Sequence, residues 1–228
     1  MSRVLMVATG ADSLRLADGS AHPTGFWAEE LVELHRALVA AGHTVDLATP
    51  GGVRAPVDPG SLDALGDGGR EIRDHLTSIT DVLARPLALA DADPTSYAAV
   101  VLPGGHGPMA DLATDADLGR ILIDAVDRGT IIGVLCHGPA GLLSAIRPDG
   151  RFAFDGRRLA VFTDEEERTG GLGERTPFWV EGSLRELGAV IDTGAPWSST
   201  VVVDGNLVSG QNPQSSIATA QRLIALLS

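Results

Sequence analysis

Apolar runs separated by turn-forming residues mark the first two thirds of the chain. Val4–Thr9, Tyr97–Leu102 and Ile131–Leu135 are almost continuously hydrophobic, which is typical of strands covered on both faces. We expect a further strand at His43–Thr49. A stretch rich in glycine, aspartate and proline follows the first strand up to Gly25 and predicts a loop.

Apolar residues at helical spacing lie between these runs. In Phe26–Ala41 the leucines recur three or four positions apart, and Gly42 stands where a glycine commonly ends a helix. Asp115–Arg128 predicts a second helix, with Gly129 as its end. Glycines interrupt the helical pattern of Ser61–Arg85, so we expect that segment to be helical in pieces.

The last third of the chain mixes both patterns. We expect a short strand at Arg158–Phe162, a glycine-rich loop at Thr169–Glu174 and a helix at Phe178–Leu187. Asp204-Gly205 lies between the predicted strands Ser199–Val203 and Asn206–Ser209 and predicts a hairpin with a type I′ turn. Asn212 is expected to cap a final helix, with Pro213 at its first position.

Strands that alternate with helices over short connections predict an α/β fold with a doubly wound, mostly parallel central sheet. The sequence shows no internal repeat and no linker long enough to divide it. We therefore expect residues 1–228 to form a single domain.

Composition narrows the class of protein. Hydrophobic residues make up 44% of the chain and charged residues 21%, as in folded globular proteins. A net charge of −13 argues against nucleic-acid partners, because phosphates would be repelled. All 17 basic residues are arginines, which excludes a lysine Schiff base. No apolar run approaches the roughly 20 residues that cross a bilayer. The start of the chain is expected to be a strand and not a signal peptide. A single cysteine fits a reducing, cytoplasmic compartment.

That single cysteine, Cys136, is the strongest chemical signal. It ends a buried strand and precedes an expected helix that runs to about Ile146, so it stands at the sheet edge where α/β proteins bind ligands. The helix N-terminus favours thiolate over thiol. Gly138 permits the tight approach of a nucleophile elbow, although Val134 occupies a position where an elbow commonly has glycine. The alternative is that Cys136 is simply a small buried hydrophobic residue.

A second turn, Pro103–Pro108, ends the neighbouring strand, and its backbone N–H groups are candidates for an oxyanion hole. It lacks the glycine fingerprint or lysine of a phosphate-binding loop. Of the six histidines, His106 in this turn and His137 beside the thiol are the two well placed for chemistry. No histidine or cysteine pair has metal-ligand spacing, so we expect neither a metal nor another cofactor.

Together these segments resemble the DJ-1/PfpI superfamily, within the class I glutamine amidotransferase-like fold, and within it the Hsp31-like branch of glyoxalase III and chaperone proteins. The resemblance covers nearly the whole chain. It rests on Thr24-Gly25 with Glu30, Pro103–Pro108, Cys136–Pro139, Phe162–Asp164 with Glu167, Ala195–Trp197, and Leu207-Val208 with Gly210, Asn212 and Pro213. It implies a three-layer α/β/α sandwich of the flavodoxin type and a homodimer.

The resemblance also implies roles for individual residues. Cys136 corresponds to the nucleophile, His137 to the adjacent acid/base, Glu30 to a carboxyl group that hydrogen-bonds the thiol, and Glu167 to the acid that completes the triad. Four acids in a row, Asp164–Glu167, leave open which of them reaches His137 or whether the run is only a solvated helix start. The candidate oxyanion and substrate-binding residues are Gly105, His106, Gly107, Gly138 and Asp164.

The implied activity is that of a glutathione-independent glyoxalase, a lyase that converts a small 2-oxoaldehyde such as methylglyoxal to lactate through a hemithioacetal on Cys136. Alternatives are an Hsp31-like holdase chaperone or a cysteine redox sensor. An amidase or cysteine protease fits less well, because the amidotransferase pattern needs a histidine downstream of the cysteine and no histidine follows His137.

Overall fold

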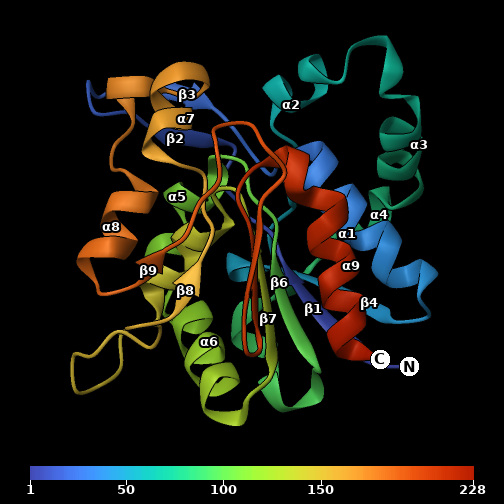
Figure 1. Ribbon diagram of the computed structural model, residues 1–228. Coiled ribbons are helices and arrows are strands. Elements are labelled where there is room, and N and C mark those ends of the chain that lie inside the picture. Colours follow the sequence, from blue (N-terminus) through green and yellow to red (C-terminus); the bar gives the residue numbers. More distant parts are fainter.

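A seven-stranded sheet runs through the centre of the molecule (Figure 1). The computed structural model describes residues 1–228. The strand order is β10-β11-β7-β6-β1-β4-β5, and every neighbouring pair is parallel except β10 and β11. These strands are β1 (Arg3–Val7), β4 (Thr44–Thr49), β5 (Leu87–Ala88), β6 (Ala99–Leu102), β7 (Ile131–Leu135), β10 (Val201–Asp204) and β11 (Leu207–Gly210).

Helices cover both faces of this sheet, which confirms the predicted three-layer α/β/α class (Figure 1). The helices are α1 (Ala28–Ala40), α2 (Pro59–Ala64), α3 (Arg70–Ser78), α4 (Thr80–Ala84), α5 (Gly107–Ala110), α6 (Ala116–Arg128), α7 (Asp164–Gly170), α8 (Val180–Glu186) and α9 (Ser216–Leu227). None of them is long and apolar enough to cross a membrane.

The continuous apolar runs are explained by two separate cores, one on each side of the sheet. In β1, Leu5 packs into the core under α6 and α8, whereas Val4 and Met6 pack into the core under α1 and α9. Successive side chains of a strand point to opposite faces, so a strand between two helical layers needs apolar residues at every position. The strands predicted from these runs are confirmed.

Local signals placed several helix ends correctly. Asp115 caps α6, since its side chain accepts a hydrogen bond from Leu118 N–H at 2.8 Å, and Gly129 follows the helix with a φ of 70°. Pro213 does begin a helical turn, but the Asn212 side chain caps no backbone N–H there. Instead its amide donates to Glu166 and to a backbone carbonyl, because these buried acceptors need donors.

Several expected elements were wrong in detail. The predicted loop before Gly25 contains a two-stranded hairpin, β2 (Ser13–Arg15) and β3 (Ala21–Pro23), closed by a turn in which the Asp18 side chain accepts from Ser20 N–H at 2.8 Å. The β10–β11 loop consists of Gly205 and Asn206, and only Gly205 has a positive φ, 58°. That is the pattern of a type II′ turn, which lies one residue later than the predicted type I′ turn.

Two corrections concern the region around the cysteine. The segment after it is a 3₁₀ helix, Gly138–Ser144, and not a long α-helix, because its glycines pack tightly against Leu102 and Leu118. The predicted strand at Arg158–Phe162 is only β8 (Arg158–Leu159), which pairs with β9 (Val190–Ile191) outside the central sheet. The acidic run forms α7, so the predicted loop begins after Gly170.

Candidate active site

Cys136 lies at the carboxyl end of β7 with a φ of 57°, one of two non-glycine residues with positive φ in the chain. This left-handed conformation is strained for a residue with a side chain and is typical of a nucleophile elbow. Two backbone hydrogen bonds hold the turn: Cys136 N–H donates to Gly210 at 2.9 Å, and its carbonyl accepts from Phe162 N–H at 3.0 Å. The sharp turn predicted for Cys136 is therefore present.

Glycines beside the elbow are there because nothing larger fits. A Cβ on Gly138 would lie 2.3 Å from the Leu102 carbonyl oxygen. Gly105 has a φ of 91°, and a Cβ there would lie 2.5 Å from the Gly25 carbonyl oxygen. The two strand-end turns therefore approach each other closely, and the N–H groups of Gly105 and His137 counteract in part the rise in the pKa of Cys136.

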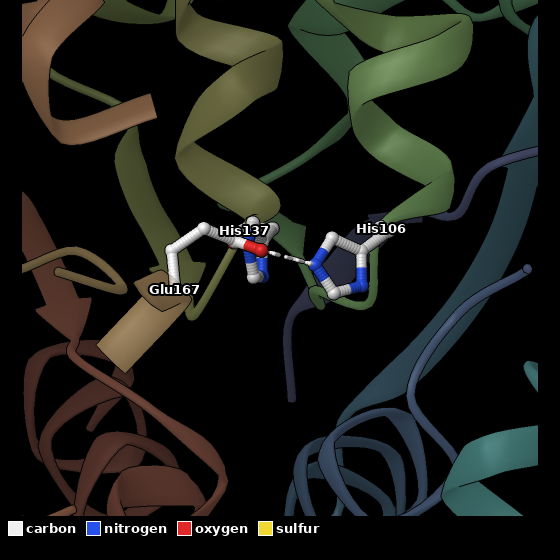
Figure 2. A group of neighbouring side chains, drawn as sticks. All are labelled: His106, His137 and Glu167. Atoms are coloured by element: carbon white, nitrogen blue, oxygen red, sulfur yellow. Dashed lines mark hydrogen bonds and ion pairs between the residues drawn. The ribbon is translucent and has the colours of Figure 1, made fainter. Parts of the chain in front are cut away.

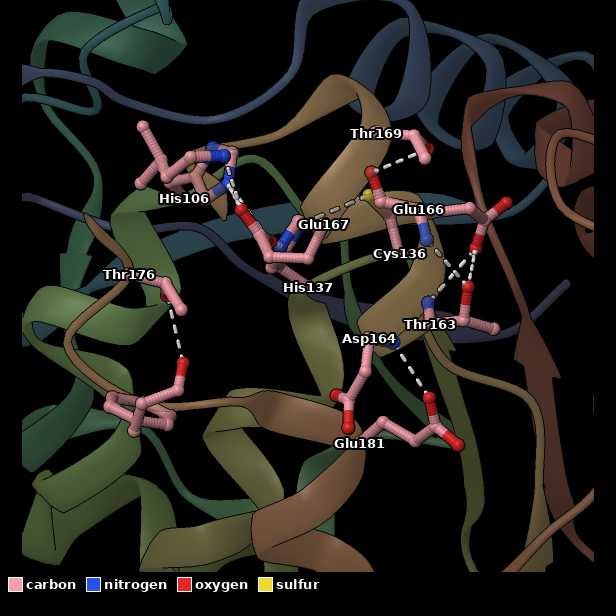
Figure 3. A network of polar contacts seen from close by, with 12 residues as sticks. His106, Cys136, His137, Thr163, Asp164, Glu166, Glu167, Thr169, Thr176 and Glu181 are labelled. Atoms are coloured by element: carbon pink, nitrogen blue, oxygen red, sulfur yellow. Dashed lines mark hydrogen bonds and ion pairs between the residues drawn. The ribbon is translucent and has the colours of Figure 1, made fainter. Parts of the chain in front are cut away.

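A chain of side chains leads away from the sulfur (Figure 3). Cys136 Sγ lies 3.3 Å from His137 Nδ1, and His137 Nε2 lies 2.6 Å from Glu167 Oε2. An ionised carboxylate only accepts hydrogen bonds, so Nε2 carries the ring proton when His137 is neutral. The free lone pair of Nδ1 then faces the thiol, which is the tautomer that a base for this cysteine needs.

The structure separates the four acids of the acidic run (Figure 3). Glu167 reaches His137, whereas Glu165 is exposed. Asp164 lies beside Glu181, whose carboxylate accepts from the Asp164 N–H at 2.7 Å, and Asp164 is not part of the cavity at Cys136. We therefore remove Asp164 from the candidate substrate-binding residues.

Glu166 fixes the helix that presents Glu167. Its Oε2 accepts from Thr163 N–H at 2.9 Å while Thr163 Oγ1 accepts from Glu166 N–H at 3.0 Å, which is a capping box at the start of α7. Its Oε1 accepts from Trp197 N–H at 2.7 Å and from Asn212 at 2.8 Å. Sequence reasoning assigned Glu166 no separate role, because the partners of its Oε1 come from two distant segments.

Glu30 lies on the other side of the thiol. It projects from α1, is fully buried, and its Oε2 accepts from Gly104 N–H at 2.7 Å. Its Oε1 has no hydrogen-bond partner, and the Cys136 thiol is near enough to influence this carboxyl. Burial raises the pKa of Glu30 to about 8. Burial, and then the Glu30 charge, also raise the pKa of Cys136, so this pair carries at most one negative charge at neutral pH.

His106 joins the other side of the site (Figure 2). Its Nε2 lies 3.2 Å from Glu167 Oε1, and its ring centroid lies 4.2 Å from that of His137. Burial, followed by the nearby His106, lowers the pKa of His137. Burial alone would raise the pKa of Glu167, but hydrogen bonds from His106 and His137 outweigh it and hold that pKa well below its usual range.

A cavity of about 100 Å³ opens onto the sulfur. Its floor is polar and its walls are aromatic, formed by Trp27, Phe162 and Trp197, which sequence reasoning did not assign to the site. Phe162 and Trp197 belong to Phe162–Asp164 and Ala195–Trp197, two of the segments on which the family resemblance rests. The sequence therefore did contain a signal for these two residues. A larger depression, of about 450 Å³ over α3 and α4, is lined by no cysteine or histidine.

The remaining candidates support the site from outside the cavity. Gly107 and Gly138 begin α5 and the 3₁₀ helix, and neither lines the cavity. Gly105 and His106 do line it. The expectation that no metal-ligand set exists was drawn from sequence spacing alone. In the structure, side-chain ligand atoms of His106, His137 and Glu167 all lie within 4.8 Å of one another, although they come from three separate segments.

A buried cysteine on a strained strand-to-helix turn, with a histidine and two buried carboxyl groups around it, defines an α/β protein of the cysteine-elbow class. Within that class the match is specific: the sequence profile of the DJ-1/PfpI family matches residues 22–226, and the chain belongs to this family.

Three relatives show how close the likeness is. Glyoxalase 3 of Candida albicans is 29% identical over 236 residues, which cover 99% of this chain and 98% of that protein. The crystal structure of glyoxalase III from Candida albicans has a TM-score of 0.80 and 27% identity, covering 98% of this chain and 96% of that one. Protein/nucleic acid deglycase HchA of Staphylococcus aureus is 28% identical over 226 residues, covering 94% and 76%. The predicted resemblance to the glyoxalase III branch is confirmed.

Proposed function

We propose that this protein is a glutathione-independent glyoxalase that converts methylglyoxal to lactate. The observation that carries the proposal is the chain Cys136–His137–Glu167, with its 3.3 and 2.6 Å contacts, at the floor of a small cavity. The relatives named glyoxalase 3 and deglycase HchA support an enzyme of the glyoxalase or deglycase type within the DJ-1/PfpI family.

In the first step the Cys136 sulfur adds to the aldehyde carbon of methylglyoxal, and His137 Nδ1 accepts the thiol proton. The product is a hemithioacetal. The N–H groups of Gly105 and His137, which lower the pKa of the Cys136 thiol, are the candidates to stabilise the charge that develops on the aldehyde oxygen. Glu167 holds the imidazole in the required tautomer and stabilises the imidazolium that forms.

The second step moves hydrogen between adjacent carbons. A base removes the proton from the former aldehyde carbon while the neighbouring carbonyl oxygen is protonated, giving an enediol; a proton is then returned to the neighbouring carbon as the hydroxyl proton of the first carbon is released. The first carbon is thereby oxidised to a thioester and the second is reduced to an alcohol, so no external oxidant or reductant is needed. Water then hydrolyses the thioester, which releases lactate and restores the Cys136 thiol.

The cavity favours a small substrate. Its volume of about 100 Å³ suits the smallest 2-oxoaldehydes and leaves no room for a glutathione adduct. Trp27, Phe162 and Trp197 exclude water from one side of the sulfur and provide apolar contacts for a methyl group.

The test is lactate formation from methylglyoxal without glutathione. Wild-type protein should form lactate, and Cys136→Ser should abolish turnover while its circular dichroism stays unchanged, because serine is close in size but far less ionised. If wild type forms no lactate yet suppresses aggregation of a heated client protein, the holdase chaperone is the correct function instead.

A further inference from the structure

Three potential metal ligands converge from separate segments on one point of the site (Figure 2). His106 precedes α5, His137 follows the elbow, and Glu167 lies in α7. Both histidines direct Nε2 at the same carboxylate: His106 Nε2 lies 3.2 and 3.3 Å from its two oxygens, and His137 Nε2 lies 2.6 Å from Oε2. Two imidazole nitrogens and one carboxylate oxygen form a ligand set that suits Zn²⁺.

Each histidine lies at a distance from the carboxylate close to that of two ligands of one ion, and all three ligand atoms lie within 4.8 Å of one another. Two ligands that each lie about 2.0–2.1 Å from a tetrahedral zinc are about 3.3 Å apart. His106 and the carboxylate already have that separation. The shorter contact between His137 and Glu167 has to open by less than about 1 Å to admit the metal.

The surroundings hold these ligands in place. The side chains of His106, His137 and Glu167 are 13%, 3% and 5% exposed, so little rotational freedom remains to be lost. Leu172 N–H donates to Glu167 Oε1, and Cys136 Sγ contacts the other ring nitrogen of His137. Such outer partners orient metal ligands. Both histidines line the cavity, so a fourth ligand can reach the ion from there.

We propose that His106 Nε2, His137 Nε2 and Glu167 bind a single Zn²⁺ ion, and that this ion inhibits the enzyme. Zinc on Nε2 displaces the ring proton of His137 to Nδ1, so no net proton has to be released. Nδ1–H then donates to the Cys136 sulfur and no longer accepts the thiol proton. The inhibition rests on the proposed glyoxalase function, whereas the binding does not.

Binding is tested directly by calorimetry with ZnCl₂ and by the visible spectrum with CoCl₂. Wild type should bind one ion, and the cobalt spectrum should be tetrahedral without a sulfur-to-cobalt charge-transfer band. Loss of an outer partner alone costs metal affinity roughly 10–100-fold, so loss of a ligand in His106→Gln should weaken binding at least that much. Cys136→Ser keeps a hydroxyl acceptor for the other ring nitrogen of His137, so it should still bind one ion, and more tightly than His106→Gln does.

The matched control is His75→Gln. His75 Nε2 lies 3.0 Å from His35 Nδ1 between α1 and α3, so this second histidine pair is the other place where zinc would find two imidazoles. The proposal is overturned if His75→Gln or Cys136→Ser abolishes binding while His106→Gln does not. It is also overturned if wild type binds no ion.

Activity gives an independent measurement. Zinc should inhibit methylglyoxal turnover, EDTA should restore it, and His106→Gln should need at least roughly tenfold more zinc for the same fractional inhibition. An active enzyme that binds no zinc overturns this inference and leaves the proposed function standing. A protein that binds zinc at His106 but forms no lactate overturns the proposed function and leaves the binding site standing.

Discussion

Two buried glutamates flank the Cys136–His137 pair, and they behave in opposite ways. Glu30 is 0% exposed and Glu167 is 4% exposed. Burial raises the pKa of Glu30 to about 8. The pKa of Glu167 is instead held well below its usual range, because contacts with His106 and His137 outweigh the effect of burial.

Because both carboxyl groups are buried, the difference between them comes from their hydrogen-bond partners. Glu30 accepts one backbone N–H, from Gly104, and meets another acid, the Cys136 thiol. Glu167 accepts from the backbone N–H of Leu172 and lies against two imidazole nitrogens. The raised pKa of Glu30 leaves it protonated at neutral pH, whereas Glu167 is an anionic acceptor that orients a base.

The largest expected effect comes from neutralising the anionic glutamate. Glu167→Gln places an amide where both imidazoles need an anionic acceptor, so His137 loses its tautomer control and kcat/KM for methylglyoxal should fall roughly 10²–10⁴-fold. Glu165→Gln, an exposed position two residues earlier on the same helix, is the matched control and should keep wild-type activity. Equal activity of the two variants would contradict the role assigned to Glu167.

The neutral glutamate should show itself in the pH dependence of stability. Because folding raises the pKa of Glu30 from 4.5 to about 8, its contribution to stability is complete below pH 4.5 and is lost as pH rises toward 8. At pH 7 the solution is two and a half pH units above the pKa of Glu30 in the unfolded chain, 4.5. Each unit is worth about 1.36 kcal/mol, so the free energy of unfolding loses about 3 kcal/mol by pH 7.

Glu30→Gln carries no ionisable group and escapes that loss. Its free energy of unfolding relative to wild type should therefore rise by about 3 kcal/mol between pH 4.5 and pH 7. Urea denaturation at several pH values measures this difference, with Glu165→Gln as the reference for general pH effects. A difference that does not change with pH would show that Glu30 is ionised in the folded protein.

The smallest effect concerns the reactivity of the thiol. The Glu30 charge raises the pKa of the Cys136 thiol, and glutamine carries no charge. Glu30→Gln should therefore lower the pH midpoint of Cys136 alkylation by iodoacetamide by up to about one unit. An unchanged midpoint would mean that Glu30 does not tune the nucleophile.

Much of the fold was predictable because the signals are local. Each strand between two helical layers is apolar at every position, as in Val4–Val7, and α6 carries its own start and end signals in Asp115 and Gly129. The missed β2–β3 hairpin is short, and in its first strand only Leu14 is buried, so its pattern is weak. The 3₁₀ helix after Cys136 was missed because its geometry depends on the contacts of Gly138 with Leu102.

By itself, the sequence determined the layered α/β class, the place of Cys136 at a strand end and its adjacency to His137. These features depend on neighbours along the chain. Only the tertiary structure decided which acid serves His137, why Glu30 and Glu167 differ in charge, and that His106 shares the carboxylate of Glu167. Those properties depend on distances between segments far apart in sequence and on partners buried with them, and no spacing along the chain encodes either.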